Sequence, residues 1–246
     1  MPQPDDFAAV IPCLNEGRTI AAVVRGVRAL TSRVIVVDDG STDTTAATAA
    51  AVGARVVRHP RNRGKGAALR TGISLAAQLG CRWAATLDGD GQHAPEDLIR
   101  LRERAEATGA ALVIGDRLSG GAPGMPWVRR LANRWMSRRL SLRAGVPMAD
   151  TQSGLRWIAL DAWQRLELRT HRFEIESETV LAFARAGCRL EFVPVAARPS
   201  LRPSHIRPLR DTWRWVRWWW DLPRGPRSTD WPGAAGRAMR HGAGEA

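Results

Sequence analysis

Residues 86–93 read Thr-Leu-Asp-Gly-Asp-Gly-Gln-His, and residues 36–41 read Val-Val-Asp-Asp-Gly-Ser. In both stretches an apolar run ends directly in acidic residues. A buried strand of an open α/β sheet delivers ligand-binding side chains in this way, at its carboxyl end. Asp88 and Asp90 supply hard oxygen ligands of the kind that Mg²⁺ or Mn²⁺ prefers when it carries a diphosphate. One D-x-D turn is weak evidence, but two acidic strand ends in one chain are much harder to obtain by chance.

The composition fits a single large α/β domain. The chain has 246 residues, of which 44% are hydrophobic, enough for a substantial core. The sequence contains no run of eighteen or more apolar residues, so no membrane-spanning helix is predicted. The first residues, Met1–Asp6, lack the basic and apolar regions of a signal peptide, so we expect a cytoplasmic protein. Cys13, Cys81 and Cys188 are far apart in apolar surroundings and are expected to be free thiols.

The chain is strongly basic, with a formal net charge of +13. Lys65 is the only lysine, so nearly all of the positive charge comes from arginine. Such a charge favours binding to anions: nucleotides, phospholipid headgroups or nucleic acid. Charge alone does not choose among these partners.

Strands and helices alternate along the first two hundred residues. Strands are predicted at 7–13, 33–37, 54–58, 83–87, 111–114, 155–158 and 189–195. Helices are predicted at 16–30, 42–52 with Ser41 as N-cap, 64–79, 95–108, 127–144 and 174–186. This alternation predicts a mainly parallel central sheet with helices on both faces.

The character of the chain changes at Pro199. We predict one α/β domain over residues 1–198, a basic and aromatic segment over 199–222, and a disordered Gly/Pro/Arg/Ala tail over 223–246. Within the middle segment, a helix over 211–220 is expected to be amphipathic. Its apolar stripe would be Ile206, Leu209, Trp213, Val216 and Trp220, beside a stripe of Arg207, Arg210, Arg214 and Arg217.

Such an Arg/Trp helix is suited to lie in the membrane interface, which predicts an anionic membrane surface as a partner of residues 206–220. The alternative is a helix packed on its own domain or on a dimer partner. Stacking on single-stranded nucleic acid is not expected, because no nucleic-acid-binding motif accompanies the helix.

Several motifs occur together and in order. They are Val10-Ile11-Pro12-Cys13-Leu14-Asn15-Glu16, residues 36–43, Asn62-Arg63-Gly64-Lys65-Gly66, residues 87–96 and Gly115-Asp116-Arg117. Together they resemble the family 2 glycosyltransferases of the GT-A fold, and among these the dolichyl- or polyprenyl-phosphate sugar transferases. The resemblance covers roughly residues 7–215. It implies a Rossmann-like sheet and transfer of a sugar, with inversion, from a nucleoside-diphosphate donor.

The resemblance also implies roles for individual residues. Those that would bind the donor are Pro12, Asn15, Glu16, Asp38, Asp39, Gly64, Lys65 and Asp88, with Asp39 accepting hydrogen bonds from the base or ribose. The implied metal ligands are Asp88, Asp90 and Gln92, for Mg²⁺ or Mn²⁺. The turn at Gly64 and Lys65 is either a phosphate-binding nest or an ordinary glycine turn before a helix. His93 is either a further site residue or a turn residue.

Two further segments point to the acceptor. Residues 150–156 resemble the D-x-x-S-G-[FL]-[RK] segment of the polyprenyl-phosphate branch, and residues 204–211 resemble its S-H-[FI]-R-P-x-R-D segment. Implied acceptor or phosphate ligands are Arg117, Ser153, Glu176, Ser204, His205 and Arg207. The implied catalytic residues are Asp90, Asp150 and Arg117. The alternative for His205 is that it belongs to a solvated basic turn. The alternative for Glu176 is an ordinary acidic residue in the first turn of a helix.

The nature of the acceptor depends on whether a general base is present. A hydroxyl acceptor needs a base to remove its proton, whereas a phosphate acceptor is already an anion. Many hydroxyl-using relatives have an acidic pair where this chain has Ala149-Asp150, with one acid only. The single acid therefore favours a phosphate acceptor. Together with the resemblance and the Arg/Trp helix, it predicts transfer to a polyprenyl-phosphate lipid by a peripheral enzyme at the cytoplasmic face of the membrane.

Three alternatives stay open. The first is transfer to a hydroxyl of a glycolipid or glycan, with Asp150 as base. The second is a noncatalytic membrane-binding scaffold. The third is a nucleotidyltransferase, although Pro12-Cys13-Leu14-Asn15-Glu16 stands where its Gly-rich signature is expected. Neither the sugar nor the base of the donor, uracil or guanine, follows from the sequence.

Overall fold

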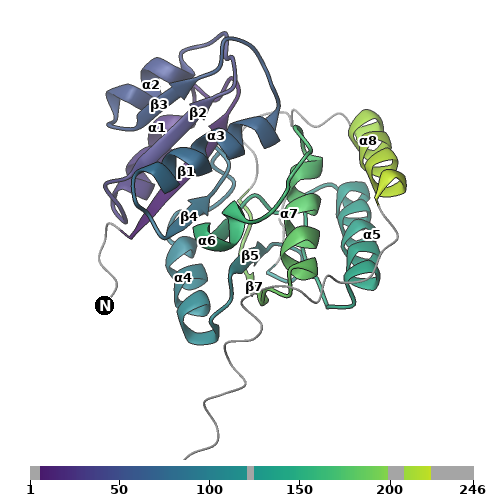
Figure 1. Ribbon diagram of the computed structural model, residues 1–246. Helices are drawn as coiled ribbons and strands as arrows, with labels where there is room; N and C mark the ends of the chain where they lie inside the picture. Colours follow the sequence, from purple (N-terminus) through teal and green to yellow (C-terminus); the bar gives the residue numbers. More distant parts are fainter. Residues whose placement is uncertain (1–5, 121–124, 199–207, 223–246) are drawn as a thin grey trace, which may run out of the picture.

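The computed structural model describes residues 6–120, 125–198 and 208–222, and its centre is a seven-stranded sheet (Figure 1). The strand order is β3-β2-β1-β4-β6-β5-β7. The strands are β1 Phe7–Cys13, β2 Val34–Asp38, β3 Arg55–Arg58, β4 Trp83–Thr86, β5 Leu112–Asp116, β6 Arg156–Ala159 and β7 Leu190–Pro194. Only β6 runs antiparallel to its neighbours β4 and β5. The predicted mainly parallel α/β fold is confirmed.

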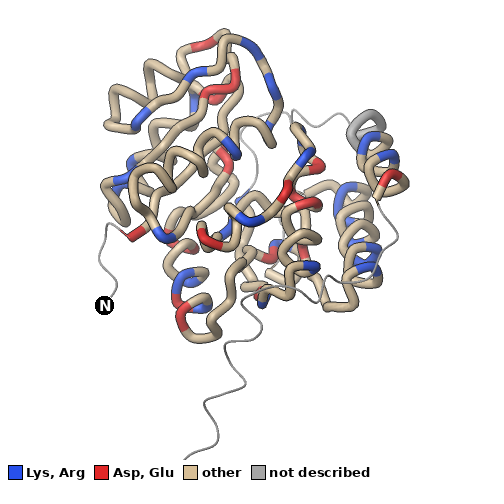
Figure 2. The backbone as a smooth tube through the Cα atoms, in the orientation of Figure 1, with Lys and Arg blue, Asp and Glu red and all other residues tan. Residues whose placement is uncertain are grey.

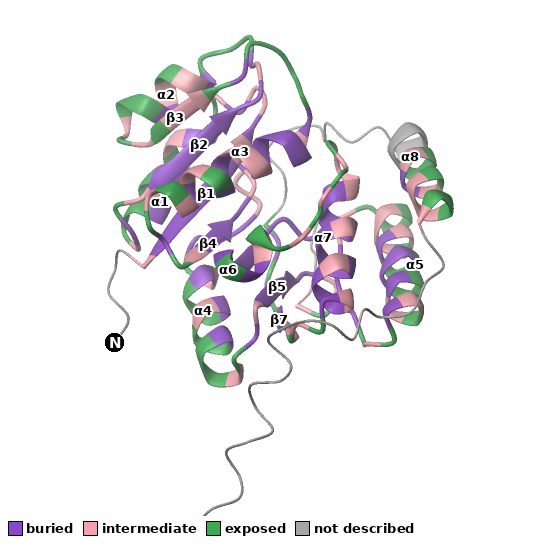
Figure 3. Ribbon diagram, viewed as in Figure 1, coloured by how far each residue is buried: buried purple, intermediate pink, exposed green. Residues whose placement is uncertain are grey.

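Helices cover both faces of the sheet because the strands are apolar on both sides. They are α1 Ile20–Arg28, α2 Thr45–Ala51, α3 Lys65–Gln78, α4 Asp97–Thr108, α5 Trp127–Ala144, α6 Leu160–Gln164, α7 Glu174–Arg185 and α8 Pro208–Asp221. Alternate residues of β1 enter opposite cores: Val10 packs with α3 and α7, while Ile11 packs with α1 and α4. The sheet is accordingly buried throughout its centre (Figure 3).

Some predicted boundaries were wrong. Helix α1 begins at Ile20 instead of Glu16, and α2 is preceded by Thr44 instead of Ser41. Ser41 does not cap a helix: its hydroxyl accepts a hydrogen bond from the backbone N–H of Asn15 at 2.8 Å. The sequence analysis also missed α6, because a five-residue helix is too short for a periodic pattern to reveal.

The antiparallel strand β6 decides which loop reaches the edge of the sheet where the acidic turns lie. Arg156, at its start, pairs with Thr86 at the end of β4 and with Ile114 near the end of β5. The segment that leads into β6, residues 150–155, is therefore placed at the carboxyl edge of the parallel strands. This is where an open α/β sheet binds its ligands.

Helix α8 packs on its own domain through one face. Such packing was the alternative to a helix that lies in the membrane interface. Trp215 is 2% exposed, and its indole Nε1 donates a hydrogen bond to Ser177 Oγ of α7 at 2.8 Å. Its ring lies 5.3 Å, between centroids, from Trp135 of α5. Trp213 and Trp220, from the predicted membrane stripe, are 62% and 69% exposed. Ile206 and Arg207 lie outside the described residues.

The cysteines and the length of the helices can be compared with the sequence-based expectations. Cys13, Cys81 and Cys188 are free thiols, as predicted. Across residues 6–120, 125–198 and 208–222, none of the helices combines the length and apolar character that a bilayer span requires. The tail over 223–246 falls outside the described residues.

Close packing of α3 on β1 depends on Gly72. A Cβ built on this residue would lie 2.3 Å from Val10 Cγ1 and 3.1 Å from Val37 Cγ2. We expect Gly72→Ala to lower the free energy of unfolding by about 1–3 kcal/mol, because overpacking outweighs the gain in helix propensity. Urea unfolding measures the change. The control Ser74→Ala, at an exposed position of the same helix, should change stability by less than about 0.5 kcal/mol. An equally stable Gly72→Ala variant would contradict the packing argument.

Candidate functional site

Acidic and basic side chains from five segments meet at the carboxyl edge of the sheet. Asp38 ends β2 and Asp39 follows it, Asp88 and Asp90 follow β4, and Arg117 follows β5. The antiparallel β6 adds Asp150 from the loop before it, and α7 adds Glu176 from its first turn. The structure thus brings together most of the residues that the sequence analysis selected.

Lys65 joins two of these carboxylates. From the first residue of α3, its Nζ lies 2.5 Å from Asp88 Oδ1 and 2.6 Å from Glu176 Oε1. Burial opposes ionisation of Asp88, but the charge of Lys65 outweighs it and lowers the pKa of Asp88 to about 2. Burial likewise opposes the charge of Lys65, yet the two carboxylates raise the pKa of Lys65 above its ordinary value. Asp88 and Lys65 are therefore both charged near neutral pH.

Gly154 is a residue of this site that the sequence analysis did not select. A Cβ at this position would lie 2.5 Å from Asp88 Oδ2, so any larger residue would push the carboxylate away. The carbonyl of Gly154 accepts a hydrogen bond from Thr86 Oγ1 at 2.8 Å, which holds the loop against the end of β4. The signal was present in the Ser153-Gly154 pair of the quoted motif, but the close approach is a tertiary feature.

Asp90 and its neighbours fit a divalent cation. Burial and the negative charge of Asp88 raise the pKa of Asp90. Its Oδ1 accepts the backbone N–H of Gln92 at 3.0 Å, which orders the turn. Two adjacent carboxylates with hard oxygen donors, one of them destabilised by its like-charged partner, suit Mg²⁺ or Mn²⁺. Within the described ranges, no group of three or more His, Cys, Asp and Glu side chains forms a ready-made metal cluster.

His93 lies buried beside these carboxylates. Burial, helped by the charges of Arg117 and Lys65, lowers the pKa of His93 to about 4, so the imidazole is neutral at neutral pH. In the described part of the chain, its Nδ1 is buried with no hydrogen-bond partner. A buried nitrogen of this kind is one that a bound ligand would satisfy. Its position supports the site role over that of a simple turn residue.

Asp39 binds the turn that was considered as a phosphate nest. Its Oδ1 accepts the backbone N–H of Arg63 at 2.9 Å, and its Oδ2 accepts that of Gly64 at 2.7 Å. His59 Nδ1 lies 2.7 Å from the same Oδ1. The amides of the turn thus hold an internal carboxylate. Gly64 is also required sterically, since its φ is +97° and a Cβ would lie 2.4 Å from the carbonyl oxygen of His171.

Asp38 has a structural position. The residue is 0% exposed, and its Oδ1 accepts the backbone N–H of Ser41 at 2.9 Å. Arg58 Nε lies 3.2 Å from its Oδ2 as an ion pair, although the geometry is not that of a hydrogen bond. A direct contact between Asp38 and a nucleotide would require this pocket to open.

The loop after β1 reaches the D-x-D turn. Asn15 has a φ of +55°, which asparagine tolerates better than most residues, and its Oδ1 accepts the backbone N–H of Thr42 at 2.8 Å. Thr19 Oγ1 donates to the carbonyl of Gly89 at 2.6 Å and lies 3.3 Å from Glu16 Oε2. Glu16 therefore lies next to the turn that carries Asp88 and Asp90, and the half-buried Pro12 precedes it at the end of β1.

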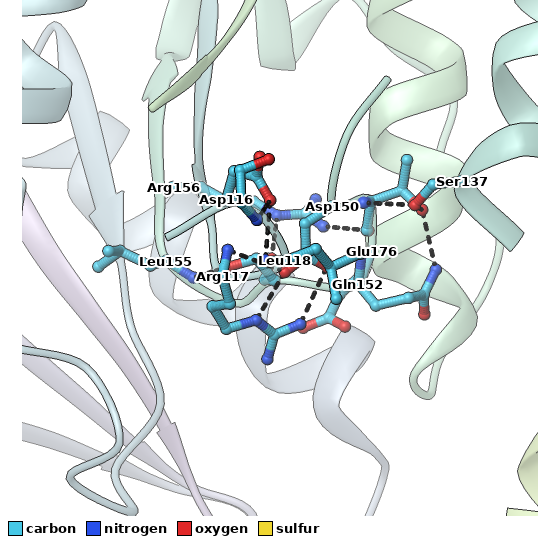
Figure 4. A network of polar contacts seen from close by, with 12 residues as sticks. Asp116, Arg117, Leu118, Ser137, Asp150, Gln152, Leu155, Arg156 and Glu176 are labelled. Atoms are coloured by element: carbon cyan, nitrogen blue, oxygen red, sulfur yellow. Dashed lines mark hydrogen bonds and ion pairs between the residues drawn. The ribbon is translucent and has the colours of Figure 1, made fainter. Parts of the chain in front are cut away.

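Arg117 and Asp150 form a buried, two-pronged ion pair (Figure 4). Arg117 Nε donates to Asp150 Oδ2 at 2.7 Å, and Nη2 donates to Oδ1 at 3.0 Å. Arg117 is 4% exposed and Asp150 is 0% exposed. Asp150 raises the pKa of Arg117 in spite of its burial. The carboxylate that the sequence analysis considered as a general base is thus already bound by a cation.

The loop that contains Asp150 is fixed by a second arginine. Arg156 Nε donates to the carbonyl of Ser153 at 2.8 Å, and its Nη2 donates to that of Thr151 at 3.0 Å. Ser153, a predicted acceptor ligand, is 0% exposed. Arg129 of α5, also not selected from the sequence, lies close enough for its charge to oppose part of the rise in the pKa of Asp90. Ser204, His205 and Arg207 lie outside the described residues.

Known proteins of similar sequence include glycosyltransferases. A protein of Methanocaldococcus jannaschii without assigned function is 33% identical over 196 residues, covering 78% of this chain and 81% of that protein. Glycosyltransferase AglJ of Haloferax volcanii is 32% identical, covering 86% and 70%. The UDP-N-acetylglucosamine–dolichyl-phosphate N-acetylglucosaminyltransferase of Methanococcus voltae is 29% identical, covering 76% and 83%.

Solved structures show the same fold. Glucosyl-3-phosphoglycerate synthase from Mycobacterium tuberculosis, in complex with Mn²⁺, UDP and phosphoglyceric acid, has a TM-score of 0.67 at 25% identity, covering 86% of this chain and 74% of that one. The model of "Glycosyl transferase family 2" matches residues 8–162, more than half of the chain. The expected family and its GT-A fold are thereby confirmed: this chain belongs to glycosyl transferase family 2.

Proposed function

We propose that this glycosyltransferase moves a sugar, with inversion, from a nucleoside-diphosphate donor to a polyprenyl-phosphate lipid at the cytoplasmic face of the membrane. The observation that carries the choice of acceptor is the buried ion pair between Arg117 and Asp150. An acceptor hydroxyl would need Asp150 as a base, but both of its oxygens accept hydrogen bonds from one guanidinium. A lipid phosphate needs no such base.

The donor site would lie over the D-x-D turn. Asp88, Asp90 and Gln92 would hold Mg²⁺ or Mn²⁺, which, when bound, offsets the negative charge of the leaving diphosphate. Support comes from the buried position of Asp90 beside Asp88, whose like charge together with burial raises the pKa of Asp90. It also comes from glucosyl-3-phosphoglycerate synthase, which has been crystallised with Mn²⁺ and UDP and with Mg²⁺ and UDP.

The rest of the site would position the reactants. Glu16, which lies beside the D-x-D turn, would line the nucleoside pocket together with Asn15 and Pro12, while Asp39 fixes the turn before α3. Arg117 would orient phosphate oxygens from the acceptor side, with its own orientation set by Asp150. Glu176 would act through Lys65, which it helps to hold against Asp88. The dolichyl-phosphate acceptor in the name of the Methanococcus voltae relative supports this assignment.

A substrate panel tests the proposal. Purified protein with Mn²⁺ would be given UDP- and GDP-sugars together with a short-chain polyprenyl phosphate or the matching polyprenol. We expect sugar-bearing lipid from the phosphate only. Product from the alcohol would favour a hydroxyl acceptor, and donor binding without any product would favour a noncatalytic scaffold. Asp150→Asn cannot decide this point, because it removes the partner of a buried arginine and costs about 3–5 kcal/mol of stability.

Removal of metal should abolish turnover. We expect EDTA to reduce lipid product by at least about a hundredfold and Mn²⁺ or Mg²⁺ to restore it, because the cation stabilises the leaving diphosphate most in the transition state. Asp90→Asn should reproduce the loss without recovery. Calorimetry with UDP would check that Mn²⁺ strengthens nucleotide binding in the natural protein and not in the variant. Asp97→Asn, at the start of α4, is the matched control. Unchanged turnover in EDTA would contradict the proposed cation.

Arginine should not replace Lys65. The ammonium fits between two carboxylate oxygens at 2.5 and 2.6 Å, and a planar guanidinium requires a different geometry. We expect Lys65→Arg to lower kcat/KM by at least about tenfold, and Lys65→Met to lower the free energy of unfolding by about 3 kcal/mol as well. Product assays and thermal unfolding measure both effects. Arg61→Lys, in the exposed loop nearby, should change neither. Full activity of Lys65→Arg would show that charge alone suffices.

A further inference from the structure

Exposed apolar side chains are concentrated on two helices. Eight large apolar residues are exposed in the described part of the chain, and all except Ile99 lie on α5 or α8. They are Trp127, Val128, Leu131, Trp135 and Leu142 on α5, and Trp213 and Trp220 on α8. Soluble proteins expose single apolar residues routinely, but their concentration on two neighbouring helices points to an interaction surface.

On α5 these residues form one stripe. Val128, Leu131, Trp135 and Leu142 follow one another at intervals of three, four and seven residues, which places them on one side of a helix. Met136 and Leu140 are buried against the domain on the opposite side. The exposed stripe is therefore a second apolar face that the domain core does not use.

The two helices lie side by side at one edge of the molecule (Figure 1). Trp135 packs against Trp215, and the guanidinium carbon of Arg143 lies 4.8 Å from the ring centroid of Trp219. Arg143 Nη2 also donates to the carbonyl of Leu222 at 2.7 Å. With Trp215 turned inward, Trp213 and Trp220 remain exposed at 62% and 69%.

The same two helices are rich in arginine (Figure 2). Helix α5 contains no acidic residue, and Arg134, Arg138 and Arg139 are exposed on it beside the apolar stripe. Arg217 is exposed on α8. Tryptophan interleaved with arginine matches a bilayer interface, where rings enter the headgroup region and guanidinium groups meet lipid phosphates.

We propose that Trp127, Val128, Leu131, Trp135, Leu142, Trp213 and Trp220 with their neighbouring arginines, here called the α5–α8 surface, dock the enzyme on an anionic lipid bilayer. The proposal extends the membrane contact from α8 to α5, and it rests on the proposed location at a membrane. A second copy of the chain is the rival occupant. A two-fold contact would set one arginine-rich face against another, which like-charge repulsion opposes.

Helix α5 also connects this surface to the site. Its first turn carries Trp127 and Val128, which are exposed, and Arg129, whose charge acts on Asp90 and Arg117. Docking through α5 would therefore bring lipid headgroups close to the acidic turn. A lipid-linked phosphate would reach the site from the bilayer without leaving it entirely.

Vesicle sedimentation with the full chain, without donor or metal, tests the surface. We expect binding to phosphatidylcholine vesicles containing phosphatidylglycerol, and at least about tenfold weaker binding to phosphatidylcholine alone. The triple variant Trp127→Ser, Leu131→Ser and Trp220→Ser should lose at least about tenfold in binding. Ile99→Ser, the exposed apolar position on α4, is the matched control and should bind normally.

A second pair of variants tests the charges. Arg134→Gln with Arg138→Gln should weaken binding to the anionic vesicles, whereas Arg25→Gln with Arg55→Gln, which removes the same charge from exposed positions on α1 and β3, should not. Unchanged thermal unfolding would show that all variants are folded. The proposal is overturned if the natural protein does not sediment with anionic vesicles, or if surface and control variants lose binding equally.

Two further measurements separate the competing explanations. Light scattering that shows a dimer, dissociated by the triple variant and without vesicle binding, would assign the α5–α8 surface to a second copy. Turnover of a water-soluble short-chain polyprenyl phosphate, measured without vesicles, reports on the acceptor alone. Vesicle binding without that turnover would reject the proposed acceptor and keep the surface. Turnover without vesicle binding would support the proposed acceptor and reject the α5–α8 surface as a membrane contact.

Discussion

The site depends on the compensation of negative charges that the fold buries. Parallel strands bring their carboxyl ends to one edge, and in this chain those ends are acidic. A buried carboxylate is costly unless it is paired. Each is compensated differently: Lys65 bridges Asp88 and Glu176, Arg117 holds Asp150, and backbone amides with His59 hold Asp39. Asp90 accepts the backbone N–H of Gln92, yet burial and the charge of Asp88 raise its pKa, so under the proposed function a bound cation would add compensation there.

These pairs also link segments that are distant in sequence. Lys65 ties α3 to the start of α7, and Asp39 ties the end of β2 to the turn before α3. Arg156 orders the loop before β6 through the carbonyls of Thr151 and Ser153, and Thr86 Oγ1 holds Gly154 of that loop against the end of β4. The ion pair with Asp150 holds the guanidinium of Arg117 in place, so under the proposed function Arg117 would orient an anionic acceptor. Chemistry on an already ionised acceptor needs nothing more from Asp150.

A hydrogen-bonded path connects α8 to this loop. Trp215 Nε1 and Gln152 Nε2 both donate to Ser177 Oγ, at 2.8 and 2.6 Å, and Gln152 is two residues from Gly154, which touches Asp88. The inward face of α8 thus contributes to the order of the site, while its outward face and that of α5 are left to solvent or a partner. Helix α8 can do both because Trp215 is buried against the domain while Trp213 and Trp220 are exposed.

The sequence by itself determined the fold class and the D-x-D turn, because strand periodicity and acidic strand ends are local features of the chain. The family followed from the resemblance of its ordered motifs. It also identified Lys65, Arg117 and Asp150 individually. Only the tertiary structure decided their partners. The antiparallel β6 brings Asp150 to Arg117 and Gly154 to Asp88, and no local pattern reveals strand direction. Likewise, packing of α8 on α5 decided which tryptophans are buried, since the helix is aromatic on several sides.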